Sequence, residues 1–295
     1  MASFLKVTAI ICLLVPAVNS QTQTAASVRQ NTMSFVFGVF DKNDEPIPNL
    51  RQEQFNITDN GQPAELIGID SSSKIPLYLG ILIDSSTSSR KYMANEKQAA
   101  TFLAGHLVHS PEDRAFVVAF DQVWDVVQDF TNDVESLKQK IEGIKPGGGT
   151  AVWDVLYFAC RDKLLKQSPN GLVRRTIILL SDGNDNQSQV TREEVLKMAL
   201  RAGVTVYVIA PDAGRAEDTL RKLGTSTGGE AFFPGKPAEW AAAVNHILRD
   251  LQSQYAATYK TTMTPAHQEF HTLSVTINEP TLKVRAPQGY FSPKP

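Results

Sequence analysis

The middle of the chain alternates short apolar runs with segments that carry apolar residues at helical spacing. The runs do not alternate polar with apolar positions, which is typical of parallel strands buried on both faces of a sheet. Strands that alternate with helices indicate an open, mainly parallel, doubly wound α/β sheet. We therefore predict such a domain at residues 76–252, with strands at 77–83, 115–120, 176–180 and 204–210.

The segments between these runs repeat apolar residues every three or four positions, as one face of an α-helix does. Thr191 and Glu194 have the spacing of a capping box, so a helix should begin there. Pro237 suits the first turn of another helix. The remaining predicted helices are centred on residues 93–107, 134–141 and 152–159.

Both ends of the chain show a β pattern instead. Residues 33–40 (MSFVFGVF) are rich in β-branched and aromatic side chains, and Asn60-Gly61 separates two further β-prone runs, which predicts a hairpin. Residues 272–277 alternate Thr and Ser with Leu, Val and Ile. We predict antiparallel strands in the flanks 32–75 and 253–295. Our hypothesis is that the two flanks together form one small β-sandwich.

The first 20 residues have the order of a secretory signal peptide. Lys6 precedes an apolar run at 7–15, and small residues stand before Ser20. The run is shorter than the ~20 residues of a spanning helix. We expect cleavage after Ser20, a disordered lead at 21–31, and an exported protein (secreted, periplasmic or at the cell surface) without a stable membrane span.

Composition and charge narrow the function classes. The chain has 29 Lys plus Arg against 31 Asp plus Glu and no long basic run, so we expect no nucleic-acid partner. Cys12 would leave with the signal peptide, so Cys160 would be the only cysteine of the mature chain and could form no internal disulfide. Its apolar neighbours predict a buried, unreactive thiol.

Oxygen-bearing side chains follow the predicted strands where the chain leaves the sheet. Open α/β sheets bind ligands at this carboxyl edge. Hard divalent cations such as Mg²⁺ prefer oxygen ligands. Because only two of these donors are charged, we expect a cation held here to keep a water that an outside carboxylate can displace. The two carboxylates and three hydroxyls are Asp84, Ser86, Ser88, Thr150 and Asp182.

In this order, and on these elements, the five residues resemble the metal-ion-dependent adhesion site of von Willebrand factor type A domains. The likeness covers about residues 76–252. The flanking segments 44–50 and 284–291 resemble type A-related proteins of acidobacteria and other bacteria. The resemblance implies Mg²⁺, Mn²⁺ or Ca²⁺ as the metal and an Asp or Glu of a partner protein as the ligand. It also implies that the hydroxyls bind the metal more directly than the two carboxylates do.

Two further acidic residues lie near these motifs. Asp154 follows Thr150 by one helical turn, and Asp185 follows Asp182 by three residues. Each is a candidate for supporting or rimming the cation. Asp154 also suits the helix dipole, and Asp185 suits a loop cap.

Three functions are compatible with this pattern. The first is a binding module, because no general base or nucleophile accompanies the predicted cation, and we expect the protein not to be an enzyme. The second is a metal-dependent hydrolase or phosphatase-like enzyme. Against it, Ser86 stands where a haloacid-dehalogenase-like phosphatase needs a second Asp, and no nucleophile elbow or phosphate-binding loop is present. The third is a structural module for assembly at the cell surface, with a mainly structural metal.

Overall fold

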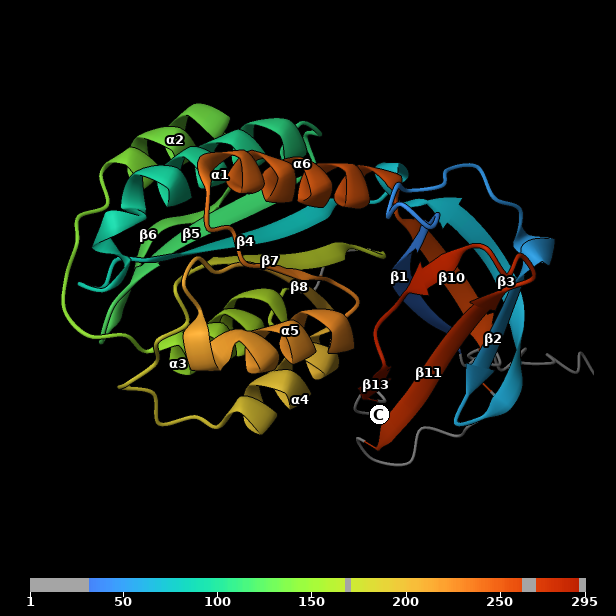
Figure 1. Ribbon diagram of the computed structural model, residues 1–295. Helices are drawn as coiled ribbons and strands as arrows, with labels where there is room; N and C mark the ends of the chain where they lie inside the picture. Colours follow the sequence, from blue (N-terminus) through green and yellow to red (C-terminus); the bar gives the residue numbers. More distant parts are fainter. Residues whose placement is uncertain (1–31, 168–170, 262–268, 292–295) are drawn as a thin grey trace, which may run out of the picture. The chain divides into compact units, whose positions relative to one another are not determined.

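Two sheets make up the part of the chain that the computed structural model describes, residues 32–167, 171–261 and 269–291 (Figure 1). These residues fall within one compact unit, Asn31–Pro295. The predicted signal peptide and lead, residues 1–31, lie outside the described residues and stay predictions. In the described ranges, no helix has the length and apolar character needed to cross a membrane.

The first sheet has six strands in the order β6-β5-β4-β7-β8-β9. Its strands run parallel except β6, which pairs antiparallel with β5 at one edge. This confirms the predicted mainly parallel sheet. The strands are β4 (Leu77–Asp84), β5 (Arg114–Phe120), β6 (Trp124–Thr131), β7 (Arg174–Leu180), β8 (Val204–Ile209) and β9 (Ala231–Phe232).

Helices cover both faces of this sheet, which is what doubly wound means. On one face lie α1 (Met93–Leu107), α2 (Val134–Glu142) and α6 (Pro237–Ser253). On the other lie α3 (Val152–Phe158), α4 (Arg192–Ala202) and α5 (Glu217–Ser226), as Figure 1 shows. The predicted capping box of Thr191 and Glu194 opens α4, and Pro237 begins α6.

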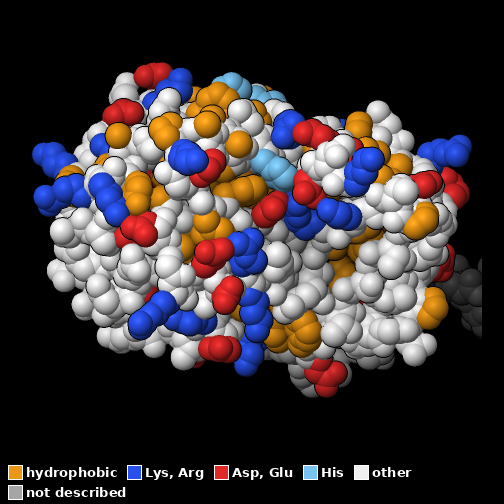
Figure 2. Space-filling model, viewed as in Figure 1, with side chains coloured by type: hydrophobic (Ala, Val, Ile, Leu, Met, Phe, Trp, Pro, Cys, Tyr) orange, Lys and Arg blue, Asp and Glu red, His pale blue; other side chains and the backbone are white. Residues whose placement is uncertain are grey.

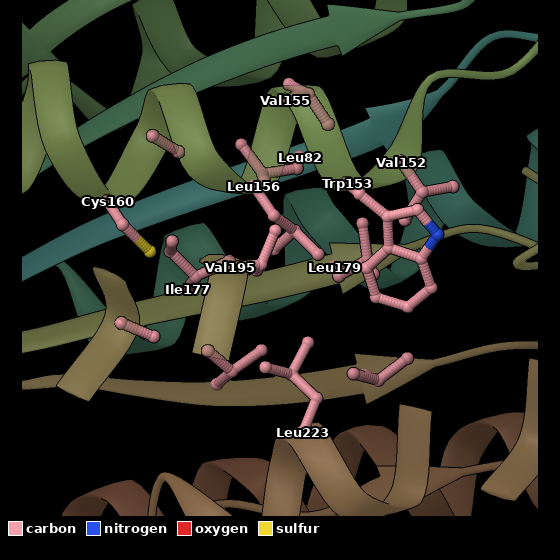
Figure 3. Packing of buried hydrophobic residues seen from close by; sticks show 14 of the residues in the cluster. Leu82, Val152, Trp153, Val155, Leu156, Cys160, Ile177, Leu179, Val195 and Leu223 are labelled. Atoms are coloured by element: carbon pink, nitrogen blue, oxygen red, sulfur yellow. The ribbon is translucent and has the colours of Figure 1, made fainter. Parts of the chain in front are cut away.

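Side chains of α3 pack against the strands beneath them. Val152 and Leu156 meet Leu82 of β4 and Leu179 of β7 in a fully buried cluster (Figure 3). Cys160 belongs to the same cluster, and its burial raises the pKa of its thiol to about 12. The predicted unreactive thiol is thus confirmed.

The second sheet is curled and draws its strands from both ends of the chain, in the order β12-β1-β10-β3-β2-β11-β13. All of its neighbouring strands pair antiparallel. Asn60 and Gly61 both have positive φ and join β2 to β3 as the predicted hairpin. The strands are β1 (Thr32–Phe40), β2 (Phe55–Asp59), β3 (Gln62–Ser71), β10 (Tyr255–Lys260), β11 (Phe270–Ile277), β12 (Lys283–Arg285) and β13 (Gly289–Phe291).

The α/β domain is inserted between β3 and β10. These two strands are neighbours, with Ser71 opposite Tyr255, and Ser72 N donates to Gln254 O at 2.9 Å where the chain leaves and re-enters the curled sheet. The entry and exit of the α/β domain therefore lie side by side.

Candidate metal centre

Asp84 is the last residue of β4 and lies at the carboxyl edge of the parallel sheet. Its neighbour in the sheet is β7, whose last residue, Leu180, lies opposite Ile83. Ser181, the next residue, donates its hydroxyl hydrogen to Asp84 Oδ2 at 2.5 Å. On the other side, Ser86 N donates to Asp84 Oδ1 at 2.8 Å. Both carboxylate oxygens are therefore held in fixed directions.

Hydrogen bonds between backbones bring the loop after Asp84 against the loop that precedes α3. Gly147 N donates to Ser85 O, and Thr87 N donates to Gly148 O at 3.0 Å. Thr87 Oγ1 also donates to Gly147 O at 2.8 Å. On the first loop, Ser86 Oγ lies 3.1 Å from Ser88 Oγ.

A third loop, which follows β7, is tied to the same place. Thr150 O accepts from Asn186 N at 3.0 Å and from Gln187 N at 3.1 Å. Thr150 N donates in turn to Asn186 Oδ1. Asp182 stands at the start of this loop, where its Oδ1 accepts from Asn184 N at 3.0 Å. The loops that carry the five predicted donors are thus joined to one another.

Glycine is required where the second loop approaches its neighbours. A Cβ on Gly147 would stand 2.0 Å from Asp121 Oδ2, which no side chain could tolerate without moving the loop. The prediction that the glycines before Thr150 allow a close approach is borne out at this position. Thr150 does not cap the helix, because α3 has Ala151 as its N-cap residue.

The two carboxylates of the site are buried without a basic partner. Asp84 is 0% exposed and Asp182 is 2% exposed, and neither forms an ion pair among the described residues. Burial, and then the nearby charge of Asp182, raise the pKa of Asp84 to about 6. A buried carboxylate without a counter-ion is costly. A cation between the two would offset that cost.

A third buried acid, Glu96 of α1, was not predicted. It is 0% exposed, and burial followed by the charges of Asp84 and Asp182 raises its pKa to about 9. Ser89 Oγ donates to Glu96 Oε1 at 2.9 Å, and Oε2 is buried without a hydrogen-bond partner in the described part of the chain. The sequence held a signal for it, since Glu96 is the one acidic residue on the apolar face of that helix pattern.

Asp154 and Asp185 join α3 to the loop that carries Asp182. Asp154 Oδ1 accepts from the backbone nitrogens of Gln189 and Val190 at 2.9 and 2.8 Å. Asp185 Oδ2 accepts from the Ser188 hydroxyl and from Trp153 N. Both carboxylates therefore bind protein groups that fix the loop.

The donor set fits a hard cation. Within the described residues, no three His, Cys, Asp or Glu side chains are grouped so that they could hold a metal ion by themselves. The five predicted donors instead combine two carboxylates with three hydroxyls. Such an all-oxygen set suits Mg²⁺, Mn²⁺ or Ca²⁺ better than it suits soft metals.

Comparison with known proteins identifies the fold family. A family model described as the von Willebrand factor type A domain matches residues 79–253, which is more than half of the chain. The chain belongs to this family. Among curated proteins, no relative of the vWA chain is found.

Solved structures share the vWA fold at low sequence identity. Proximal thread matrix protein 1 from the mussel byssus, whose structure is described as having a zinc-occupied MIDAS motif, matches at 19% identity and TM-score 0.53, over 62% of this chain and 49% of its own. A von Willebrand factor type A structure from Catenulispora acidiphila matches at 13% identity and TM-score 0.50, over 90% of this chain and 72% of its own.

A third neighbour is the vWF domain of the type V pili tip protein Mfa5 from Porphyromonas gingivalis. It matches at 17% identity and TM-score 0.50, over 59% of this chain and 94% of its own. The present chain spans about half the length of the mussel protein. At these identities the likeness concerns the fold alone.

Proposed function

We propose that the vWA domain binds one divalent cation and uses it to capture an Asp or Glu side chain of a partner protein. The observation that carries the proposal is the pair of buried acids, Asp84 and Asp182, which lie without a basic partner beside hydroxyl groups. The residues that would hold the cation are Asp84, Ser86, Ser88, Thr150 and Asp182.

The roles follow from what each side chain offers. The three hydroxyls are neutral donors, so they orient the cation without cancelling its charge. The bound cation would supply an electrophilic position that a partner's carboxylate can occupy in place of water. Asp154 and Asp185 would hold the loop of Asp182 in place and would not themselves touch the cation.

Family membership favours binding over catalysis. Type A domains generally mediate metal-dependent protein–protein interactions and are typically not enzymes. They bind a divalent metal at the adhesion site, and the mussel structure holds zinc there. The proposed metal of this chain is Mg²⁺, with Mn²⁺ and Ca²⁺ as alternatives, and zinc belongs in the same titration.

Calorimetric titration of the purified protein with each cation tests the site. We expect one-to-one binding that is lost in Asp84→Asn and Asp182→Asn and is kept in Asp125→Asn, which alters an exposed acid of β6. In EDTA, Asp84→Asn should unfold at the same temperature as wild type or higher, because it removes a buried charge. In Mg²⁺, only the wild type should gain stability. A wild type that binds no cation would refute the proposal.

Manganese tests the open position separately. Bound Mn²⁺ that keeps a water ligand relaxes water protons strongly, and millimolar acetate should reduce this effect by displacing that water. Acetamide is the matched neutral control and should change nothing. A protein that binds Mn²⁺ tightly but does not respond to acetate would have a closed, structural metal, which would contradict carboxylate capture.

We further propose that the protein is exported, on the basis of the predicted signal peptide at residues 1–20. Mass spectrometry of the protein recovered from a secreting host should give an N-terminus at Gln21. An intact Met1 or Ala2 on exported protein would contradict the predicted cleavage.

A further inference from the structure

A cavity of about 780 Å³ lies at the opposite edge of the parallel sheet from the candidate metal centre. Arg174 and Arg175 begin β7 at this cavity, whereas Ser181 and Asp182 follow the other end of the same strand. The remaining wall comes from the end of α4, the start of β8 and the strands β1 and β13 of the curled sheet. The volume is in the range that small-molecule sites occupy.

The described lining of this cavity is positively charged. It contains four arginines and no Asp or Glu: Arg161, Arg174, Arg175 and Arg201. A cleft lined by one sign of charge concentrates ligands of the opposite sign. Elsewhere on the surface, basic and acidic side chains are interspersed, as the face shown in Figure 2 illustrates. The cavity therefore differs from its surroundings in charge.

The two arginines of β7 are held by carbonyl groups. Arg174 donates to Ile75 O and Leu251 O at 3.1 and 2.7 Å. Arg175 donates to Leu164 O and Gln167 O at 3.2 and 3.3 Å. These bonds fix the guanidinium groups but bring no negative charge.

No carboxylate in the described residues pairs with Arg174, Arg175 or Arg201, whereas Arg161 pairs with Asp162. Burial lowers the pKa of both Arg174 and Arg175, yet a guanidinium stays charged in proteins. Partly buried positive charge without a counter-ion favours an anion.

The rest of the wall is apolar and aromatic. Arg201 lies over the Phe291 ring, 5.0 Å from its centroid, so the charged and apolar parts of the wall meet there. Methionine and aromatic side chains adapt to apolar ligands of varied shape. The apolar lining includes Met33, Phe35, Tyr157, Met198, Tyr290 and Phe291.

We propose that this cavity binds a small amphipathic anion, with a carboxylate or phosphate head at Arg175 and Arg201 and an alkyl or aryl body against the apolar wall. Arg174 fixes the wall, and Arg175 and Arg201 supply the charge. The site does not use the metal centre, so its occupation requires no divalent cation.

Titration calorimetry in EDTA tests this with octyl phosphate and octanoate. We expect one-to-one binding of at least one of them, and the stronger of the two identifies the head group. Octyltrimethylammonium, which has the same chain and the opposite charge, should not bind, and inorganic phosphate should bind at least tenfold more weakly. Failure of both octyl anions to bind the folded wild type would overturn the proposal.

Variants locate the site. Arg175→Gln and Arg201→Gln should each weaken binding at least tenfold, and Arg215→Gln, an exposed arginine outside the cavity, should leave it unchanged. Should Arg175→Gln fail to fold, the exposed Arg201 decides the matter, since its loss costs no buried contact. Asp84→Asn should bind the octyl anion as wild type does, which separates this site from the proposed metal function. Unchanged affinity in the arginine variants would overturn the assignment.

Discussion

Three buried acids, Asp84, Asp182 and Glu96, place negative charge at the carboxyl edge of the vWA sheet. The pKa of Asp84 and that of Glu96 are both raised, chiefly by burial and further by the neighbouring acids. Without a cation, one proton or more would be retained there near neutral pH. The residues that make the site ready for a cation therefore make the cation-free protein sensitive to pH.

Glu96→Gln should stabilise the cation-free protein increasingly as pH rises. The pKa of Glu96 is about 9 in the folded chain, against an ordinary value of 4.5, so the folded state holds a proton that the unfolded state has released. Wild type then loses stability between about pH 5 and pH 9, by on the order of 1 kcal/mol per pH unit. Glutamine does not titrate and removes this loss.

Urea unfolding in EDTA at several pH values measures the difference between the two proteins. Glu142→Gln, which changes an exposed glutamate of α2, is the control and should run parallel to wild type. Parallel profiles for wild type and Glu96→Gln would show that Glu96 is not protonated in the folded state.

The sequence alone located the oxygen donors because each follows the end of a predicted strand. Glu96 lies in the middle of a helix, twelve positions after Asp84, and no motif includes it. Only its isolation among Met93, Ala100 and Leu103 indicated burial. Its nearness to the acids of the site depends on how α1 packs on β4, which a sequence pattern does not specify.

At the scale of elements, α3 and the loop after β7 act together. Asp154 accepts two backbone hydrogen bonds from that loop, so the position of Asp182 depends on a helix that precedes it in the chain. This arrangement is typical of groups that orient metal ligands without touching the metal.

Asp154→Asn should weaken cation binding about tenfold without abolishing it, because the loop loses its charged acceptor while all five donors remain. Calorimetry with Mn²⁺ measures the change, and Asp218→Asn, an exposed acid in the first turn of α5, serves as the control. An affinity equal to that of wild type would mean that the loop holds its shape without Asp154. Complete loss would instead make Asp154 a direct ligand.

The elements themselves were predictable to different degrees. Strands β4, β5, β7 and β8 were found because burial on both faces leaves an uninterrupted apolar run. Strand β6 was missed because its sequence, WDVVQDFT, mixes charged with apolar residues at an exposed sheet edge. Helix α5 was missed because few of its residues are buried, and β9 has only two residues.

At the scale of the whole vWA chain, a buried polar cluster joins the curled sheet to α6. Arg285 of β12 donates to Asp250 Oδ2 at 2.8 Å and pairs with Glu230 at 2.8 Å. The Tyr207 hydroxyl donates to the same Asp250 oxygen at 2.6 Å. One arginine thus offsets two acids that burial would otherwise leave unpaired.

Arg285→Gln should destabilise the protein by about 3 kcal/mol, because it strands Asp250 and Glu230 without their cation. Lys283→Gln is the matched control on the same strand, since Lys283 pairs with Asp44 while 62% exposed, and it should cost less than about 1 kcal/mol. Urea unfolding at neutral pH compares the two. Equal losses would mean that the buried cluster adds nothing to stability.

The arrangement of the curled sheet was beyond reach of the sequence, although its β character was not. Alternation of Leu273, Val275 and Ile277 shows which face of β11 is buried, but it does not name a partner strand. Strand β11 pairs with β2 and β13, and β1 with β10 and β12. Such pairings join segments from opposite ends of the chain, and local patterns contain no information about them. The domain boundaries at 32–75, 76–252 and 253–295 remain predictions.

The shared sheet has a consequence for how the chain is made. Ser34 of β1 contacts Thr258 of β10, 224 positions later, so β1 leaves the ribosome long before either of its partner strands exists. At ~5–20 residues per second, β1 to β3 wait roughly 10 to 40 s for β10. During that interval the inserted domain can complete its own sheet, while the first hairpin presents unpaired edges to other nascent chains. Slowing translation within residues 77–253 would lengthen this exposure, and a chaperone that covers strand edges would have its natural substrate there.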